Sequence, residues 1–263
     1  MKKNSLLFVL TLLLLTLSLS SLKPGIKPSR SIYQLTVYHY KTAEQEKALD
    51  AYLQNALLPA LHRQQIKNIG VFKNHANDTA ADKTLYVYTP YTSLNAIITV
   101  AEKLKADKDY QTAGAEYINA VYNNPPYSRM ENILLQAFPL APQMELPDLK
   151  NERKERVYEL RSYESATEKI FANKVHMFNE GDEIGLFKRL HFNAVFYGEV
   201  VSGSKMPNLM YITCHENKAA REANWKNFGE APEWKKLISM PEYSNNVSHI
   251  DINFLYPTAY SDF

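Results

Sequence analysis

The 263-residue sequence predicts an α+β protein made of two tandem repeats, each with the element order β-α-β-β-α-β. Three observations support this prediction. An aromatic strand pattern occurs twice, a helix-start motif follows both copies, and the same succession of β-rich and helical stretches comes after each motif. The element order is that of a ferredoxin-like unit. Two domains of ordinary size also agree with the chain length.

The opening strand of each repeat carries the clearest sign of duplication. Residues 31–38 (SIYQLTVY) and 156–163 (RVYELRSY) align at an offset of 125, which is 158 minus 33. The same offset pairs similar residues over more than fifty positions: Tyr33 with Tyr158, Leu35 with Leu160, Tyr38 with Tyr163, Phe72 with Tyr197, and Tyr86 with Tyr211. An ordered series of this kind indicates an internal repeat.

Matching elements follow the two opening strands. Thr42–Gln45 and Ser165–Glu168 both read S/T-x-x-E/Q, the capping box that starts a helix. Strands are then expected near 70–73 and 84–88 in the first repeat, and near 195–201 and 208–213 in the second, because β-branched and aromatic residues are frequent there. Helical regions at 93–121 and 217–239 precede closing strands at 133–138 and 247–256. Trp225 and Phe228, three residues apart, are expected to pack in the core.

The N-terminal residues have the order of parts of a secretory signal. Lys2 and Lys3 precede an uncharged run over 6–19 and a cluster of small residues. The run is shorter than the roughly 20 residues that span a membrane, so a cleaved signal is favoured over an uncleaved anchor. The predicted organisation is a signal peptide at 1–20, a linker at 21–30, a divergent first repeat at 31–142, a linker at 143–155 and a second repeat at 156–263. Export to the periplasm or the extracellular space follows, with no stable membrane insertion after cleavage.

Composition restricts the classes of partner. The net charge of +2 from 30 basic and 28 acidic side chains gives no electrostatic basis for binding nucleic acid. Cys214 is the single cysteine, so no intrachain disulfide can form. The seven histidines show no i, i+2 or i, i+4 pairs, and we expect no metal site. His39 and His215 lie at predicted strand ends, where ordinary surface positions are the favoured interpretation.

The second repeat resembles the NIPSNAP family. The resemblance lies in 157–163 (VYELRSY), 208–212 (NLMYI), 219–225 (AAREANW) and 232–234 (PEW). It extends over 156–256 and is weaker over 31–140, where Gln34 and Thr36 replace Glu and Arg. The resemblance implies the dimeric α+β barrel class, in which ferredoxin-like sheets pair face to face. Two arrangements are open: a monomer whose two repeats form the barrel internally, and a homodimer. Some barrels of this wider class bind haem; the sequence predicts no cofactor, with haem left open.

Strand alternation suggests a ligand site. Glu159, Arg161 and Tyr163 share one strand face, and the Leu160 face is expected to meet the helices. The charged face would then point into the barrel with its first-repeat counterparts. The predicted ligand-binding residues are Gln34, Tyr38, Glu159, Arg161 and Tyr163.

In this interpretation Arg161 binds a carboxylate, and the second repeat is the favoured functional half. The favoured interpretation of this pair is structural: Glu159 and Arg161 neutralise each other or pair across strands. No catalytic residue is identified. The predicted role is small-molecule binding or an accessory function. The alternatives are an enzyme using the barrel cavity, either like a cofactor-free monooxygenase or associated with haem, and a structural or interaction protein with a filled barrel.

Overall fold

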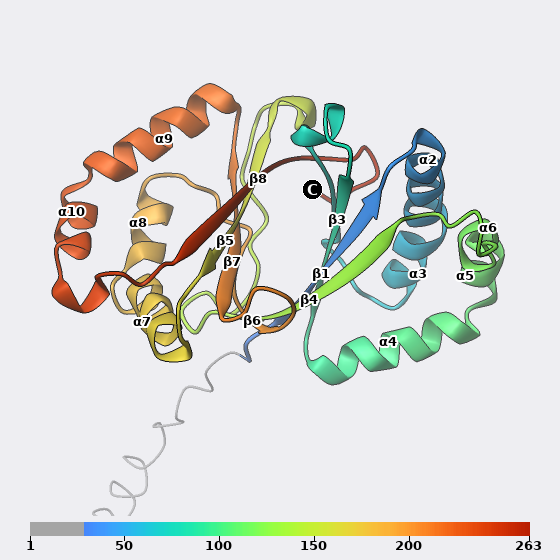
Figure 1. Ribbon diagram of the computed structural model, residues 1–263, viewed down its shortest axis with the longest axis horizontal. Helices are drawn as coiled ribbons and strands as arrows, with labels where there is room; N and C mark the ends of the chain where they lie inside the picture. Colours follow the sequence, from blue (N-terminus) through green and yellow to red (C-terminus); the bar gives the residue numbers. More distant parts are fainter. Residues whose placement is uncertain (1–28) are drawn as a thin grey trace, which may run out of the picture.

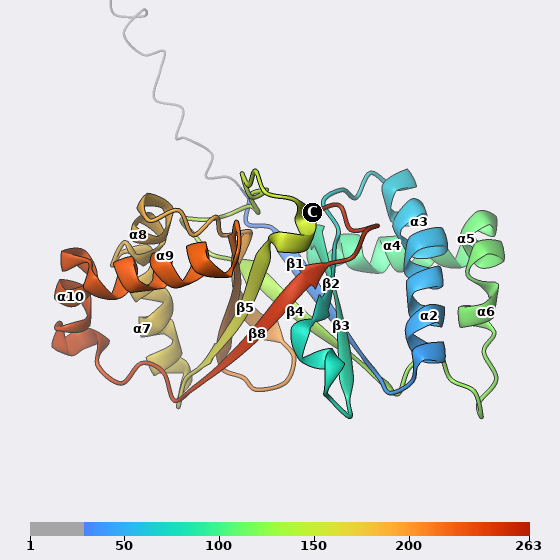
Figure 2. The same cartoon turned by 90° about the horizontal axis from the view of Figure 1, so that it is seen from above.

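Eight strands close into a barrel in this computed structural model, which describes residues 29–263 (Figure 1). Helices of the first repeat cover one flank of the barrel, and helices of the second repeat cover the other (Figure 2). The predicted signal peptide at 1–20 lies outside the described residues. Within the described part of the chain, no helix is both long enough and apolar enough to cross a membrane.

Each repeat has the predicted element order. The first contains β1 (Ile32–Tyr40), α2 (Ala43–Tyr52), a π-helical turn (Leu53–Leu57), α3 (Leu58–Arg63), β2 (Gly70–Asn74), β3 (Lys83–Tyr91), α4 (Leu94–Ala106), α5 (Lys108–Ala113), α6 (Ala115–Ile118) and β4 (Arg129–Ala137). The second contains β5 (Val157–Glu164), α7 (Glu168–Asn179), α8 (Glu183–Arg189), β6 (Phe196–Ser202), β7 (Asn208–His215), α9 (Lys218–Glu230), α10 (Pro232–Ile238) and β8 (His249–Pro257).

The barrel is formed within a single chain, as expected for a duplicated unit. Its strand order is β1-β3-β2-β8-β5-β7-β6-β4, and all neighbours are antiparallel. The repeats meet at two joints, β2 with β8 and β4 with β6. The two joints close the sheet over short stretches, pairing 72–74 with 255–257 and 134–137 with 198–202.

Side chains from both repeats fill the barrel interior. They are mainly aromatic and aliphatic, and include Tyr33, Leu35, Val37, Phe72, Tyr88, Tyr158, Leu160, Phe196, Ile212, Leu255 and Phe263. An eight-stranded barrel is just wide enough for its side chains to fill it. The interior is therefore a packed core, and it agrees with the filled barrel that was one of the sequence-based alternatives.

The predicted orientation of the opening strands is wrong. Tyr158 and Leu160 belong to the interior core, whereas Tyr163 packs against the helices of the second repeat and Glu159 contacts α9. Both faces of these strands are buried, so alternation separates the faces without identifying which one points inward. The polar face points outward because Arg221 and Trp225 of α9 supply hydrogen-bond partners for Glu159 there.

The offset of 125 holds for the opening strands but fails in the hairpin. Thr36 pairs with Val87 on β3 and Arg161 pairs with Tyr211 on β7, so the true offset there is 124, which is 211 minus 87. Tyr86 accordingly faces the interior, while Tyr211 faces the helices. A one-residue slip reverses the face of every side chain. The pairing of Phe72 with Tyr197 fails in the same way.

One of the two predicted capping boxes is correct. Thr42 caps α2 by accepting a hydrogen bond from the Gln45 backbone N–H. In the second repeat the cap is Thr167, which accepts from the Ile170 N–H, and not Ser165. The Ser165 hydroxyl instead donates to the Asn246 backbone carbonyl at 2.7 Å. Its side chain therefore bonds to the loop before β8 and does not cap the helix.

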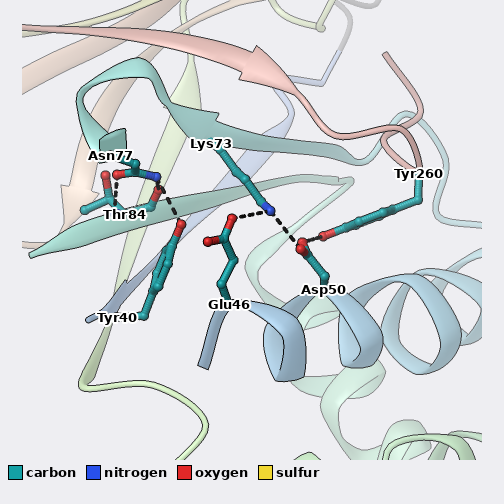
Figure 3. A network of polar contacts seen from close by, with 7 residues as sticks. All are labelled: Tyr40, Glu46, Asp50, Lys73, Asn77, Thr84 and Tyr260. Atoms are coloured by element: carbon teal, nitrogen blue, oxygen red, sulfur yellow. Dashed lines mark hydrogen bonds and ion pairs between the residues drawn. The ribbon is translucent and has the colours of Figure 1, made fainter. Parts of the chain in front are cut away.

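A polar network fastens the segment after β8 to the first repeat (Figure 3). The Lys73 ammonium on β2 donates to Glu46 and Asp50 of α2 at 2.6 and 2.7 Å. The Tyr260 hydroxyl donates to the other oxygen of Asp50 at 2.6 Å. Lys73 is mostly buried, and its charge is balanced locally. The polar groups of this network bond to one another, and the network joins the two repeats. It is therefore not the candidate ligand site.

Candidate functional site

A pocket of about 200 Å³ lies between the outer face of the first-repeat sheet and its helices. We call it the first-repeat pocket. Its walls are apolar side chains and tyrosines, and its lining contains no charged side chain. Its lining includes Gln34, Thr36, Tyr38, Tyr52, Tyr91, Ile97, Val100, Ala101 and Asn132. Most ligand sites have this character, a largely apolar wall with a few polar groups that fix orientation.

The polar end of the pocket is built from β1 and β4. The Gln34 side-chain N–H donates to the Asn132 side-chain oxygen at 2.8 Å, and the Thr36 hydroxyl donates to the same oxygen at 2.7 Å. Thr36 and Asn132 are paired across the two strands, which explains their proximity. Within the described part of the chain, the Gln34 side-chain oxygen and the Asn132 side-chain N–H₂ make no hydrogen bond. One acceptor and one donor are thus free to contact a ligand.

Tyrosines form a neutral part of the pocket wall. The Tyr52 and Tyr117 rings stack with centroids 3.6 Å apart, and the Tyr117 hydroxyl donates to the Tyr38 hydroxyl at 3.4 Å. Burial raises the pKa of Tyr38 and Tyr52 well above the ordinary tyrosine value, and neighbouring tyrosine hydroxyls raise it further. Both hydroxyls therefore stay protonated at physiological pH. The wall offers aromatic surface and no charge.

The equivalent space in the second repeat is occupied by larger side chains. Strand pairing makes Glu159 and Arg161 the counterparts of Gln34 and Thr36. On the helices, Ser93 caps α4 and Asn217 caps α9, an offset of 124, which is 217 minus 93. That offset places Arg221 where the first repeat has Ile97, and Trp225 where it has Ala101.

These side chains form an ion-pair network around one carboxylate. Glu159 is fully buried and accepts hydrogen bonds from Arg221 Nε at 2.9 Å, Arg221 Nη2 at 3.0 Å and Trp225 Nε1 at 2.9 Å. Arg161 Nε lies 3.0 Å from the same carboxylate, and the Arg161 guanidinium stacks 4.1 Å from the Trp225 ring. Burial favours the neutral form of Glu159, but the Arg221 and Trp225 hydrogen bonds and the nearby Arg161 charge outweigh it, and its pKa lies below the ordinary value.

The five predicted ligand-binding residues thus divide into two groups, on the two flanks of the barrel. Gln34 and Tyr38 line the first-repeat pocket. Glu159, Arg161 and Tyr163 belong to the second-repeat network, where the Arg161 Nη1 donates to the Tyr163 hydroxyl at 2.9 Å. These contacts favour the structural ion pair for Glu159 and Arg161. The pocket lies in the repeat that the sequence interpretation did not favour.

Several pocket residues were missed because their role depends on tertiary neighbours. Asn132 lies in the closing strand and contacts β1 from 96 positions away along the chain. Ala101 carries no chemical signal of its own. Ala101 and Trp225 lie at the same distance from their helix caps, Ser93 and Asn217, and this spacing can be read from the sequence. It shows that a small residue in the first repeat corresponds to a large one in the second.

Removing the Trp225 side chain is expected to open the second-repeat space. The Trp225→Ala variant should lose about 2–3 kcal/mol of unfolding free energy, because it forfeits packing against Phe187, Phe192 and Phe228 and one hydrogen bond to Glu159. Urea denaturation measures this loss. A change below about 0.5 kcal/mol would mean that Trp225 does not fill the space.

His215 is a buried histidine at the end of β7. It is 1% exposed, and its Nδ1 lies 3.2 Å from the Asn224 side-chain nitrogen. Burial lowers the pKa of His215 from 6.5 to about 4, and the nearby Glu159 charge only partly opposes this shift. The ring is therefore neutral in the folded protein near pH 7.

This shift predicts a pH dependence of stability. Between pH 6.5 and about 4 the unfolded chain binds a proton at His215 and the folded chain does not, so stability should fall as the pH is lowered through this range. At pH 5.0 the loss relative to pH 7.5 should be about 2 kcal/mol, at 1.36 kcal/mol per pKa unit. Urea denaturation at both pH values should show a smaller difference in His215→Gln. Equal pH dependence in the two proteins would contradict the assignment.

One exposed group could hold a metal ion. Ligand atoms of Glu164, His249 and Asp251 lie within 4.8 Å of one another. The Lys205 ammonium donates to Asp251, so a cation already occupies part of this group. Its contacts are those of a surface ion pair, and we assign it no metal.

Comparison with known proteins places the chain among α+β barrels. The NIPSNAP family model matches residues 158–262. A candidate monooxygenase from Lactobacillus acidophilus NCFM is 14% identical, with 87% of this chain and 94% of that chain covered and a TM-score of 0.57. An anthrone oxidase-like protein is 10% identical, with 88% and 92% covered and a TM-score of 0.50. At these identities the likeness establishes the fold alone.

A NIPSNAP family protein from Agrobacterium tumefaciens C58 is 19% identical, with 40% of this chain and 96% of that chain covered and a TM-score of 0.36. No curated protein matches the chain.

Proposed function

We propose that this chain, whose residues 158–262 form a NIPSNAP domain within an α+β barrel, binds a small and largely apolar molecule in the first-repeat pocket. One observation carries the proposal. Two equivalent spaces exist in the duplicated fold, and the second is filled by Trp225 and an ion-pair network, while the first is open and lined with apolar and tyrosine side chains.

The size of the pocket indicates a small ligand. Its volume of about 200 Å³ lies below the range of roughly 300–1,000 Å³ typical of drug-sized ligands. A buried apolar cavity of about 150 Å³ is enough to bind benzene. The pocket therefore suits one aromatic ring or a short aliphatic group, with a hydroxyl or amide that contacts Gln34 and Asn132.

Binding without catalysis is the role that the lining supports best. The lining holds no charged side chain and no cysteine or histidine that could act as a nucleophile or a base. Fold relatives include a candidate monooxygenase and an anthrone oxidase-like protein, which is consistent with a small-molecule site but assigns no reaction to this chain. The filled barrel interior favours a structural role as the second candidate. Export through the predicted signal peptide is part of the proposal.

A titration with p-cresol tests the proposed function. The ring matches the tyrosine-lined wall, and its hydroxyl can reach the Gln34 carbonyl oxygen. We expect saturable binding with a dissociation constant near 1 mM, about −4.1 kcal/mol, measured by NMR chemical-shift changes. Changes should be largest for the amides of β1 and α4. Shift changes that do not saturate, or that centre on the second repeat, would support the structural role instead.

A further inference from the structure

A second hollow of about 650 Å³ adjoins the first-repeat pocket. It lies among the turn after α3, the connection from β3 to α4, and the outer side of α4. Tyr91 and Val100 line both spaces, so they form a common wall between the apolar pocket and this larger, more polar hollow. We call it the vestibule.

The lining of the vestibule carries two positive charges and no negative charge. The lining includes Lys67 and Lys103 and no aspartate or glutamate. Within residues 29–263, neither lysine takes part in any of the ion pairs. The adjoining pocket contains no charged side chain either. The linings of the two adjoining spaces together are therefore positive.

Gln64 adds unused hydrogen-bonding groups to the vestibule. Both its side-chain oxygen and its side-chain nitrogen are buried, and neither has a hydrogen-bond partner among the described residues. Gln64 lines the vestibule. Buried polar atoms are rarely left without partners unless water or a ligand supplies them. Gln65, Gln143 and Asn95 line the same hollow, so uncharged donors surround the two lysines.

We infer that the ligand of the first-repeat pocket is an amphipathic anion. An aromatic or short aliphatic group occupies the pocket, a short spacer passes Tyr91 and Val100, and a carboxylate or similar anionic group lies in the vestibule near Lys67 and Lys103. The inference rests on the proposed function, because it names the chemical class of ligand for the same site. The ammonium groups supply charge-assisted hydrogen bonds, which are stronger than neutral ones.

A matched pair of probes tests this inference. 4-Phenylbutyrate and 4-phenylbutyramide have the same ring and spacer and differ only in the charge of the terminal group. Isothermal titration calorimetry at low salt should show the carboxylate binding about tenfold more tightly than the amide. The Lys67→Gln, Lys103→Gln double variant should bind both probes about equally. High salt should reduce the difference in the wild-type protein, because the lysines are exposed.

The outcomes separate this inference from the proposed function. Equal affinities in the wild-type protein, with binding of both probes abolished by Ala101→Trp, would overturn the anionic ligand and leave the pocket in place. A tighter carboxylate that Ala101→Trp does not affect would place the anion outside the pocket and overturn both. If neither probe binds, the anionic-ligand inference and the proposed function are both overturned. The Lys67→Gln, Lys103→Gln variant is expected to fold normally, because both lysines are exposed and unpaired.

Discussion

Replacing Ala101 by tryptophan is expected to abolish binding in the first-repeat pocket without unfolding the protein. Ala101 corresponds to Trp225, and the pocket exists because the first repeat has a methyl group where the second has an indole. Ala101 is exposed at the mouth of the pocket, so the larger side chain can enter without displacing the core. Binding of p-cresol, measured by NMR titration, should weaken by at least tenfold.

A control variant separates occlusion from a general effect of tryptophan on α4. Ala106 is exposed on the same helix and lies outside the pocket lining. Ala106→Trp should leave both the affinity and the midpoint of thermal unfolding unchanged. If the two tryptophan variants bind p-cresol equally well, the ligand does not occupy this pocket.

Removing the Glu159 carboxylate is expected to have the largest effect on stability. In Glu159→Ala, the Arg161 and Arg221 guanidinium groups lose their only nearby carboxylate partner among the described residues while their side chains remain 12% and 22% exposed. Breaking a buried ion pair by deleting one partner costs about 3–5 kcal/mol. Urea denaturation at pH 7 measures this cost.

The equivalent change in the first repeat provides a matched comparison. Gln34→Ala removes a neutral amide from the corresponding position, and the loss should be about 1 kcal/mol, because its partners Thr36 and Asn132 still bond to each other. Similar losses for Glu159→Ala and Gln34→Ala would show that the charged network contributes no more than an ordinary hydrogen bond.

The architecture was accessible from the sequence because duplication repeats local signals. Tyr33-Gln34-Leu35 and Tyr158-Glu159-Leu160 match position for position, and the order of strands and helices follows from composition and capping residues. The closed barrel within one chain was one of the two arrangements left open by the sequence, and it is the one observed. Residue-level alignment was less accurate. The offset between the repeats is 125 on β1 and 124 on β3, so Tyr86 and Tyr211 lie on opposite faces of the sheet.

The candidate site was accessible only in part. Alternation correctly grouped Gln34 with Tyr38, and Glu159 with Arg161 and Tyr163. It could not determine which face pointed inward, since both are buried in the folded protein. The partners that decide the matter, Arg221 and Trp225, lie on α9, about sixty residues further along the chain. The sequence therefore left a ligand site and a structural ion pair both open for the charged strand face, and the observed contacts favour the ion pair.

A crystal structure of the protein soaked with p-cresol tests the central claim most directly. We predict density for one ring in the first-repeat pocket, packed against Tyr38 and Tyr52, with its hydroxyl within hydrogen-bonding distance of Gln34 or Asn132. No ring is expected in the barrel interior or between β5 and α9. Density for p-cresol in either of those two places, with the first-repeat pocket free of it, would contradict the account.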